Sequence, residues 1–252
     1  MTSGPYTEIA PPPDLGEHLQ CGWAVDPDGS RSEAILPDGC MDVVWRAGEG
    51  LIVAGPDTGP VPVVRRPGSS VVGVRFRPGA APTMLGVAAE ELRDQRVPVS
   101  ELWGDDAERL DERLHGTPSA SARLELLERT LRRRLEGAAR PDGLVAAAVA
   151  CLHGPEPPPV RELAGALAVS ERQLRRRFQT AVGYGPKTLA RILRFQRMLA
   201  LARQRASRGD LARLALDAGY ADQAHMTAEC TRLAGVPPGR LIAERYSAAA
   251  RR

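Results

Sequence analysis

Residues 163–189 read LAGALAVSERQLRRRFQTAVGYGPKTL, and residues 211–241 read LARLALDAGYADQAHMTAECTRLAGVPPGRL. The second segment repeats the first at a nearly constant offset. Five positions recur 52 residues later: Ser170 and Asp222, Leu174 and Met226, Phe178 and Cys230, Gly183 and Gly235, Pro186 and Pro238. A Leu-Ala pair recurs at an offset of 51 (163–164 and 214–215), so the second copy has one extra residue in its turn. Because self-similarity at a fixed spacing marks a duplicated supersecondary unit, the sequence predicts two copies of one unit.

Each copy carries the local signals of a helix-turn-helix unit. A short apolar helix is predicted over 160–167 and again over 211–218, and each is followed by a tight turn. The turn ends at Ser170 or Asp222, which are good N-caps for the next helix. Ser170 and Gln173 also form the S-x-x-Q pattern of a capping box. In this arrangement the second helix is the one that enters the DNA major groove.

Glycine and proline delimit the second helices. Gly183 and Gly235 stand where a helix-ending glycine belongs, and Pro186 and Pro238 follow where a further helix opens. The helix predicted over 187–203 would be about 25 Å long and would connect the two units. We expect it to space the two second helices across adjacent grooves.

The two second helices differ in what they offer to DNA. At 100° per residue, Leu174 and Phe178 share one face of the first helix, and its arginines lie on the opposite face. An arginine can bind guanine in bidentate fashion or hold a phosphate, and both interpretations stay open. The second helix has fewer polar groups, so the first unit is predicted to supply most of the affinity. The candidate DNA-contacting residues are Arg172, Gln173, Arg175, Arg176, Gln179, Lys187, Gln223, His225 and Thr227.

The paired units and their connecting helix resemble the DNA-binding domain of AraC-type bacterial transcription regulators over residues 144–246. In that family both recognition helices enter successive major-groove segments on one face of the DNA. The chain departs from the family pattern at Ala228, where a basic residue is frequent, and at Cys230, where an aromatic residue is usual. The resemblance implies base-reading roles for Arg172, Arg175 and Arg176 in the first helix, and for Gln223, Ala224, His225 and Ala228 in the second.

Charge is distributed unevenly along the chain. Residues 1–140 hold 16 Lys and Arg against 22 Asp and Glu, whereas residues 141–252 hold 18 against 9. Residues 160–209 alone hold 12 basic and 2 acidic residues, a net charge of +10. Such a concentration of cations favours a polyanionic partner such as DNA. A solvated arginine-rich surface is the alternative, since 33 of the 34 basic residues are Arg.

The first half of the chain carries runs typical of short β-strands. They contain Val, Ile and Trp and cover 21–26, 33–36, 41–46, 51–54, 61–65 and 71–77. Helical periodicity follows, clearest over 105–114 and 119–135. The sequence thus predicts an α+β chain with a β-rich N-terminal sensing domain and packed helices over 1–140, followed by an all-α DNA-binding domain over 141–252. The segments LPDGCMDVVW and GVRFRPGAA are similar to a small N-terminal domain that precedes such DNA-binding domains in some actinobacterial regulators.

Composition narrows the class of protein. The chain has 252 residues, 43% of them apolar, with no run long enough to cross a bilayer and no signal-peptide pattern in its Pro-rich start. Its four cysteines are widely spaced, which excludes a disulfide scaffold and a four-cysteine zinc site. These features predict a cytoplasmic protein of a reducing compartment.

Several residues of the first half are candidates for ligand or metal binding. Trp23, Trp45, Arg75 and Arg77 are candidates for an effector pocket, but the favoured interpretation is that the tryptophans fill the core and that the arginines pair with the domain's own acidic groups. His18, Cys21, Asp38 and Cys40 are of the types that bind zinc. The alternative is that the aspartate caps a turn and the cysteines are buried.

The favoured function is sequence-specific, DNA-binding transcription regulation. No nucleophile motif, phosphate-binding glycine loop or H-E-x-x-H occurs, so neither catalysis nor a cofactor is expected. One alternative is a DNA-tethered enzyme or a thiol-based responder to alkylation or oxidation with Cys40 as the acceptor. Another is an architectural protein that binds DNA without sequence preference. The expected partners are double-stranded DNA, a small-molecule effector and a second copy of the chain. The leucine-striped helices predicted over 105–114 and 119–135 are either domain core or the contact with that second copy.

Overall fold

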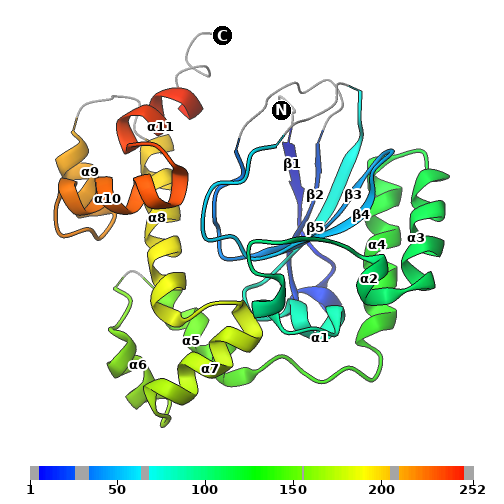
Figure 1. Ribbon diagram of the computed structural model, residues 1–252, viewed down its shortest axis with the longest axis horizontal. Helices are drawn as coiled ribbons and strands as arrows, with labels where there is room; N and C mark the ends of the chain where they lie inside the picture. Colours follow the sequence, from blue (N-terminus) through cyan, green and yellow to red (C-terminus); the bar gives the residue numbers. More distant parts are fainter. Residues whose placement is uncertain (1–5, 26–33, 64–67, 155, 205–209, 247–252) are drawn as a thin grey trace.

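The computed structural model describes residues 6–25, 34–63, 68–154, 156–204 and 210–246. A part that contains the β-sheet lies beside a wholly helical part (Figure 1). The sheet comes first in the chain and the helical part second, which confirms the predicted α+β class.

One antiparallel sheet organises the first part, with strand order β1-β2-β5-β3-β4-β6. The strands are β1 (Tyr6–Ile9), β2 (Leu19–Val25), β3 (Met41–Arg46), β4 (Gly50–Ala54), β5 (Val71–Phe76) and β6 (Arg96–Pro98). Successive side chains of a strand point to opposite faces. One face is therefore lined by the fully buried Val43, Val74 and Phe76, and the other carries the smaller cluster that includes Trp23 and Val44.

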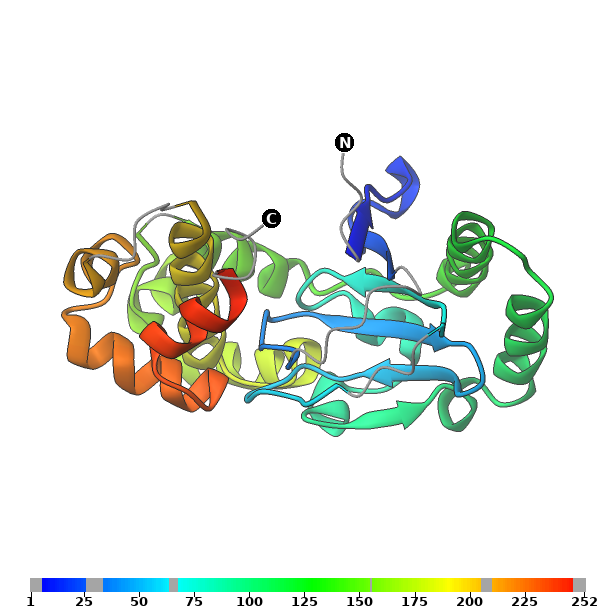
Figure 2. The ribbon, with the colours of Figure 1, turned by 90° about the horizontal axis from the view of Figure 1, so that it is seen from above.

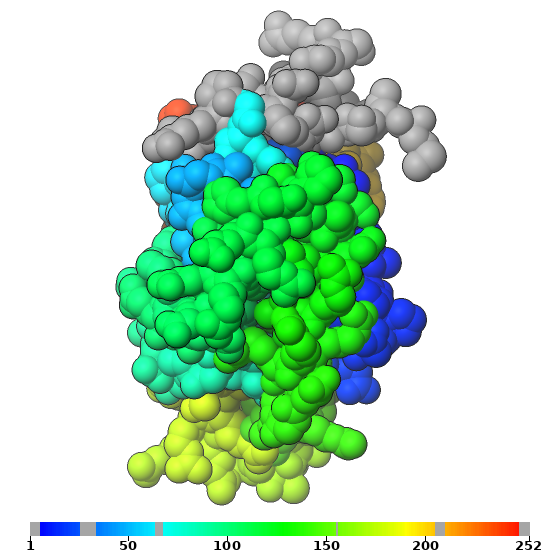
Figure 3. All heavy atoms as spheres, turned by 90° about the vertical axis from the view of Figure 1, so that its right-hand side faces the viewer, coloured from blue at the N-terminus to red at the C-terminus, as the bar shows by residue number. Residues whose placement is uncertain are grey.

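Helices cover the first of these faces. Helix α4 (Ala120–Leu135) packs against β5 and β2, and α3 (Asp105–His115) packs against β4. Ser119 caps α4 by accepting a hydrogen bond from the backbone N–H of Ala122. The two helices lie side by side at the end of the molecule away from the helical part (Figures 2 and 3). The shorter elements of this part are η1 (Pro13–Leu15), α1 (Ala81–Leu85), η2 (Ala89–Leu92) and α2 (Ser100–Trp103).

The strand predictions were only partly right. The runs at 21–26, 41–46, 51–54 and 71–77 correspond to β2, β3, β4 and β5, but 33–36 and 61–65 do not form strands in their described residues. Of these two runs only Ile35 and Val61 pair, in an isolated bridge, because the first run leaves the sheet and packs Leu36 into the helical part. The short edge strands β1 and β6 were not predicted. Residues 26, 33, 64 and 65 lie outside the described residues.

The helical part has its own core. Its helices are α5 (Gly143–His153), α6 (Val160–Ala166), α7 (Glu171–Val182), α8 (Pro186–Gln204), α9 (Leu211–Asp217), α10 (Gln223–Ala234) and α11 (Pro238–Tyr246). Leu174, Phe178, Phe195 and Met226 are fully buried in that core. The two helix-turn-helix units, α6–α7 and α9–α10, and the connecting helix α8 confirm the predicted arrangement. Within the part of the chain that the structure describes, no helix has both the length and the apolarity of a membrane span.

The two helix-turn-helix turns have the same backbone design. The N–H of Val169 bonds to the carbonyl of Ala164 at 3.0 Å, and the N–H of Tyr220 bonds to that of Ala215 at 2.9 Å, 51 residues further on. Each turn passes through the left-handed region, at Ala168 with φ 55° and at Gly219 with φ 88°. Glycine adopts this conformation without strain and alanine does not. The first unit therefore holds a strained alanine where the second has glycine.

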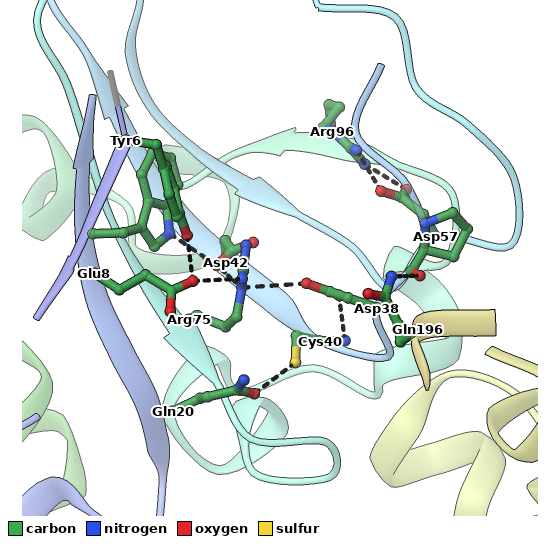
Figure 4. A network of polar contacts seen from close by, with 12 residues as sticks. Tyr6, Glu8, Gln20, Asp38, Cys40, Asp42, Asp57, Arg75, Arg96 and Gln196 are labelled. Carbon is green, nitrogen blue, oxygen red and sulfur yellow. Dashed lines mark hydrogen bonds and ion pairs between the residues drawn. The ribbon is translucent and has the colours of Figure 1, made fainter. Parts of the chain in front are cut away.

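A loop of the first part of the chain contacts the helical part. Leu36 is only 7% exposed and belongs to the core of the helical part. Gln196 Nε2 on α8 donates to the carbonyl of Pro37 at 2.6 Å, and Arg245 on α11 donates to that of Ala34 at 2.7 Å. Figure 4 shows Gln196 next to the segment that carries Asp38. One loop of the first part therefore reaches α8 and α11 together.

The C-terminal end of α7 is a second contact between the two parts. Gly183 ends α7 with φ 92°, and its carbonyl accepts a hydrogen bond from Arg93 at 3.3 Å. A Cβ atom at this glycine would lie 2.5 Å from Cγ of Pro56 and 2.9 Å from the carbonyl oxygen of Ala89. No side chain fits there without moving the backbone of η2, so the end of α7 and the first part are in close contact.

Candidate nucleic-acid interface

Helix α7 begins at a capping box, as its sequence predicted. Ser170 Oγ accepts from the N–H of Gln173 at 3.2 Å, and Gln173 Oε1 accepts from the N–H of Ser170 at 2.9 Å. The two bonds satisfy backbone groups at the helix start. The side-chain oxygen of Gln173, a candidate DNA contact, is thereby engaged in holding the helix start.

The arginine face of α7 is open to solvent. Arg172, Arg175 and Arg176 are exposed, whereas Leu174 and Phe178 on the opposite side are fully buried. Among the described residues, the three guanidinium groups have no ion-pair partner. Gln179 lies half-buried on the same face, and Lys187 is exposed in the first turn of α8. This side of the unit therefore presents unpaired positive charge on a rigid helix.

Arg177 is turned away from that face. Its Nε and Nη2 bond to the two carboxylate oxygens of Asp142 at 2.6 and 2.7 Å. Asp142 also caps α5 by accepting from the backbone N–H groups of Leu144 and Val145. Partial burial opposes the charge, but Arg177 and the two N–H groups hold the pKa of Asp142 below its usual value. Arg177 thus ties α7 to α5.

The outward face of α10 has a different chemistry. Asp222 caps this helix by accepting from the N–H of His225 at 2.7 Å. The hydroxyls of Thr227 and Thr231 both donate to the carbonyls four residues earlier, Gln223 and Thr227, at 2.8 Å. A shallow groove runs along this face, lined by Gln223, Ala224, Thr227, Ala228, Thr231 and Arg232.

A buried charge network supports α10, and the sequence analysis missed it. Glu229 is 8% exposed and accepts from Arg194 of α8 at 2.8 and 2.9 Å. The guanidinium of Arg194 also lies over the ring of Tyr220, 4.9 Å from its centre. The available signal was the offset of 52 residues, which places Glu229 at the position of Arg177, the other residue that ties a second helix to its neighbour.

The same network orients His225. Its Nε2 lies 3.3 Å from Glu229 Oε1, and its ring meets that of Tyr220 edge to face at 5.3 Å between centres. The imidazole is therefore directed toward the edge of α10 that faces α8. Of the three DNA-contact candidates on α10, Gln223 and Thr227 lie on the groove and His225 does not.

The ligand candidates of the first part do not form one pocket. Trp45 is 1% exposed in the main core, where its Nε1 donates to Asp111 at 2.8 Å, so it fills the interior. Trp23 lies over Gly73 on the opposite face of the sheet and donates to Asp42 at 3.1 Å. Arg77 donates to the carbonyl of Gly16 at 2.7 Å. The two tryptophans are thus on different faces.

Arg75 is already surrounded by carboxylates. Its guanidinium lies 3.2 Å from Asp42, 3.4 Å from Asp38 and 3.6 Å from Glu8 (Figure 4). Burial raises the pKa of Asp42 to about 6, against the opposing effect of Arg75. With three acidic neighbours, Arg75 has little positive potential to offer an anionic effector. The interpretation that it pairs with the domain's own acidic groups fits this geometry.

The thiol and metal alternatives find no support in the geometry. The Cys40 thiol is buried and donates to Gln20 Oε1 at 3.2 Å. Burial, together with Asp38, raises the pKa of this thiol well above its usual value, whereas a reactive cysteine needs a lowered one. Asp38 caps the N–H of Cys40 at 2.9 Å. Neither these residues nor His18 and Cys21 belong to any metal-binding group among the described residues.

Comparisons with known families agree with the two-part fold and its helix-turn-helix units. Residues 163–244 match a family model described as a helix-turn-helix domain, and residues 7–98 match a domain of unknown function, DUF6597. A comparison with curated proteins finds no significant match.

Among solved structures, ToxT from Vibrio cholerae is similar at 12% identity and a TM-score of 0.43, over 84% of this chain and 94% of that one. ToxT with a bound unsaturated fatty acid is similar at 11% identity and a TM-score of 0.42, over 96% and 97%.

Two helix-turn-helix units on one connecting helix, each with its second helix exposed, define a DNA-binding transcription regulator. More particularly, a DUF6597 domain over residues 7–98 precedes the helix-turn-helix domain over residues 163–244, an order that agrees with the AraC-type resemblance of residues 144–246.

Proposed function

We propose that this regulator binds its operator through both second helices and that α7 supplies most of the affinity. The observation that carries the proposal is that Arg172, Arg175 and Arg176 lie on an exposed helix face and have no ion-pair partner among the residues that the structure describes. Each of them can neutralise a phosphate or bind a guanine edge, and each such contact is worth about 1–3 kcal/mol when it reads a base. We assign Gln179 and Lys187 to the same contact surface and Gln173 to the start of the helix.

The connecting helix supports simultaneous binding by the two units. Helix α8 has 19 residues and is about 28 Å long, close to the 34 Å that separates successive turns of the major groove on one side of DNA. Phe195 is fully buried in the core to which both units contribute side chains, and the Arg194–Glu229 pair joins α8 to α10. We propose that this rigid connection sets the spacing between the two half-sites.

The first domain is proposed to control the arrangement of the two units. It contacts the end of α7 at Gly183, α8 at Gln196 and α11 at Arg245. An effector that changed these contacts would alter affinity if it bound the two arrangements with different strength. We retain Trp23 and Arg77 as candidate effector contacts, and α3 and α4 as the candidate surface for a second copy. The proposal makes the protein a cytoplasmic binding protein without catalytic activity.

Selection of bound sequences from random DNA at a stated salt concentration tests the proposal. We expect a two-part site and a preference of about 10³-fold or more over random DNA. A preference near one would overturn sequence-specific regulation and favour the architectural alternative. A matched comparison of R172A/R176A with Q223A/H225A tests the ranking of the units, because the first pair should lose more affinity. The reverse order would contradict the dominance of α7.

A further inference from the structure

We infer that α10 reads thymine by methyl contact rather than by hydrogen bonding. The site is the surface formed by Ala224, Thr227, Ala228 and Thr231, which we call the methyl face. The inference rests on the proposed function, because it takes α10 to enter the major groove. Its ligand is the 5-methyl group of thymine, the apolar group on the floor of that groove.

The position of the methyl face follows from helix geometry. At 100° per residue its four members lie within an arc of about 100°, opposite the fully buried Met226 and Cys230. The offset of 52 residues superposes them on Arg172, Arg175, Arg176 and Gln179 of α7. The methyl face therefore occupies in the second unit the place that the DNA-contacting face occupies in the first.

The hydroxyl groups of this face are turned inward. Thr227 Oγ1 donates to the carbonyl of Gln223 and Thr231 Oγ1 to that of Thr227, both at 2.8 Å. With the hydroxyls held against the helix backbone, the methyl groups are the parts of Thr227 and Thr231 that remain to line the groove. Ala224 and Ala228 add two more methyl groups to the shallow groove along this face. The centre of the methyl face is consequently apolar and has few hydrogen-bonding groups.

Polar groups lie only at the margins. Gln223 stands at one edge of the face and Arg232 at the other. His225 is held by Glu229 and Tyr220 on the side toward α8. Guanine and cytosine require donors or acceptors for direct recognition, and unpaired polar groups lose free energy when they are desolvated. An apolar surface at this place in the fold is therefore matched to thymine among the four bases.

The test replaces thymine by deoxyuridine in the selected operator, one position at a time. Deoxyuridine keeps every hydrogen-bonding group of thymine and lacks only the methyl group. We expect a loss of about fourfold in affinity per contacted methyl in the α10 half-site. The same replacement in the α7 half-site is the control and should leave affinity within twofold. Replacing a contacted thymine by cytosine should weaken binding, and 5-methylcytosine should recover part of the loss.

The protein side of the test is T227S/T231S. Serine keeps the hydroxyl bond to the preceding turn and removes the methyl group, so the helix is minimally disturbed. We expect this variant to lose most of its sensitivity to deoxyuridine, because the two changes remove the same contact. T180S is the matched control, since Thr180 makes the same kind of bond to Arg176 on α7 but lies off its arginine face.

The possible outcomes are distinguishable. If the protein binds a two-part operator tightly and deoxyuridine has no effect in the α10 half-site, the inference is overturned while the proposed function stands. If selection returns no preferred sequence, the proposed function itself fails. If T227S/T231S changes transcription without changing DNA affinity or deoxyuridine sensitivity, the methyl face is assigned to a protein partner and the inference is likewise overturned.

Discussion

Helices α7 and α10 are copies of one element with unlike outer faces. Both begin at a side-chain cap, end at a left-handed glycine and bury an apolar stripe, and both use the same position to bond to a supporting helix. At the four outward positions, however, α7 has three arginines and a glutamine, and α10 has two alanines and two threonines. The two copies thus share the positions that hold the helix in place, whereas their outward positions differ and form a cationic surface on α7 and an apolar surface on α10.

The largest effect should come from the cationic surface. We expect R172A/R176A to weaken operator binding by at least about 30-fold, and to reduce the slope of log K against log salt by about two if both arginines contact phosphates. Binding isotherms at several salt concentrations measure both quantities. An unchanged slope with a relaxed preference at one or two base pairs would instead assign these arginines to guanine edges. Affinity within threefold of the parent protein would contradict the difference between the two surfaces.

The next largest effects are expected at the two ion pairs that support the second helices, Glu229–Arg194 and Arg177–Asp142. Glu229 is largely buried and bonds bidentately to a quarter-exposed Arg194, whereas the Arg177 side chain is 42% exposed. We expect E229Q to lower the free energy of unfolding by about 2 kcal/mol and R177A by at most about 1 kcal/mol. Urea denaturation measures both. Equal losses would show that the two copies are supported to the same degree.

Substitutions in the two helix-turn-helix turns should change the free energy of unfolding by smaller amounts and in opposite directions. Ala168 holds a left-handed conformation that favours glycine, and the second copy has Gly219 there. We expect A168G to raise the free energy of unfolding by about 0.5–1 kcal/mol and G219A to lower it by a similar amount. A Cβ at Gly219 meets only ordinary contacts at 3.7 Å, so strain alone is tested. Changes of the same sign in both variants would rule out this account.

The smallest effect is expected at the margin of α10. Q223A removes one amide from the edge of the methyl face, and we expect a loss of about two- to threefold in operator affinity. Binding to operators varied at single positions should show a relaxed preference at one base pair only. A loss as large as that of R172A/R176A would place the main polar contact on α10 and reverse the comparison.

The helical part was predictable because its signals are local. Caps, terminal glycines and prolines act within a few residues of the helix they delimit, so Ser170, Asp222, Gly183 and Gly235 could be interpreted without tertiary knowledge. The wrong strands had a different cause. The run that ends at Leu36 has the composition of a strand, but Leu36 is buried by the helical part. Because these contacts join residues far apart in the sequence, local composition does not predict them.

Among the charged residues, too, those with local signals were predictable and those with distant partners were not. The exposed face of α7 was predictable because a buried hydrophobic stripe on one side of a helix implies a solvent-exposed polar face on the other side. The pairing of Glu229 with Arg194 and of Arg75 with three carboxylates joins residues 33 to 67 positions apart, or on neighbouring strands, and periodicity does not specify such partners. Long-range pairing of this kind decides which arginines are available to DNA and which are already neutralised.

The burial of Leu36 bears on how the protein melts. A side chain that one domain contributes to the interior of the other makes the domains share their stability, since neither can lose its fold without opening the same interior. Calorimetry should therefore record one joint heat-absorption peak for the full chain. A fragment that starts at residue 141 would keep α7 and α10 but would expose to water the site that Leu36 fills. It should therefore melt at a lower temperature than the full chain.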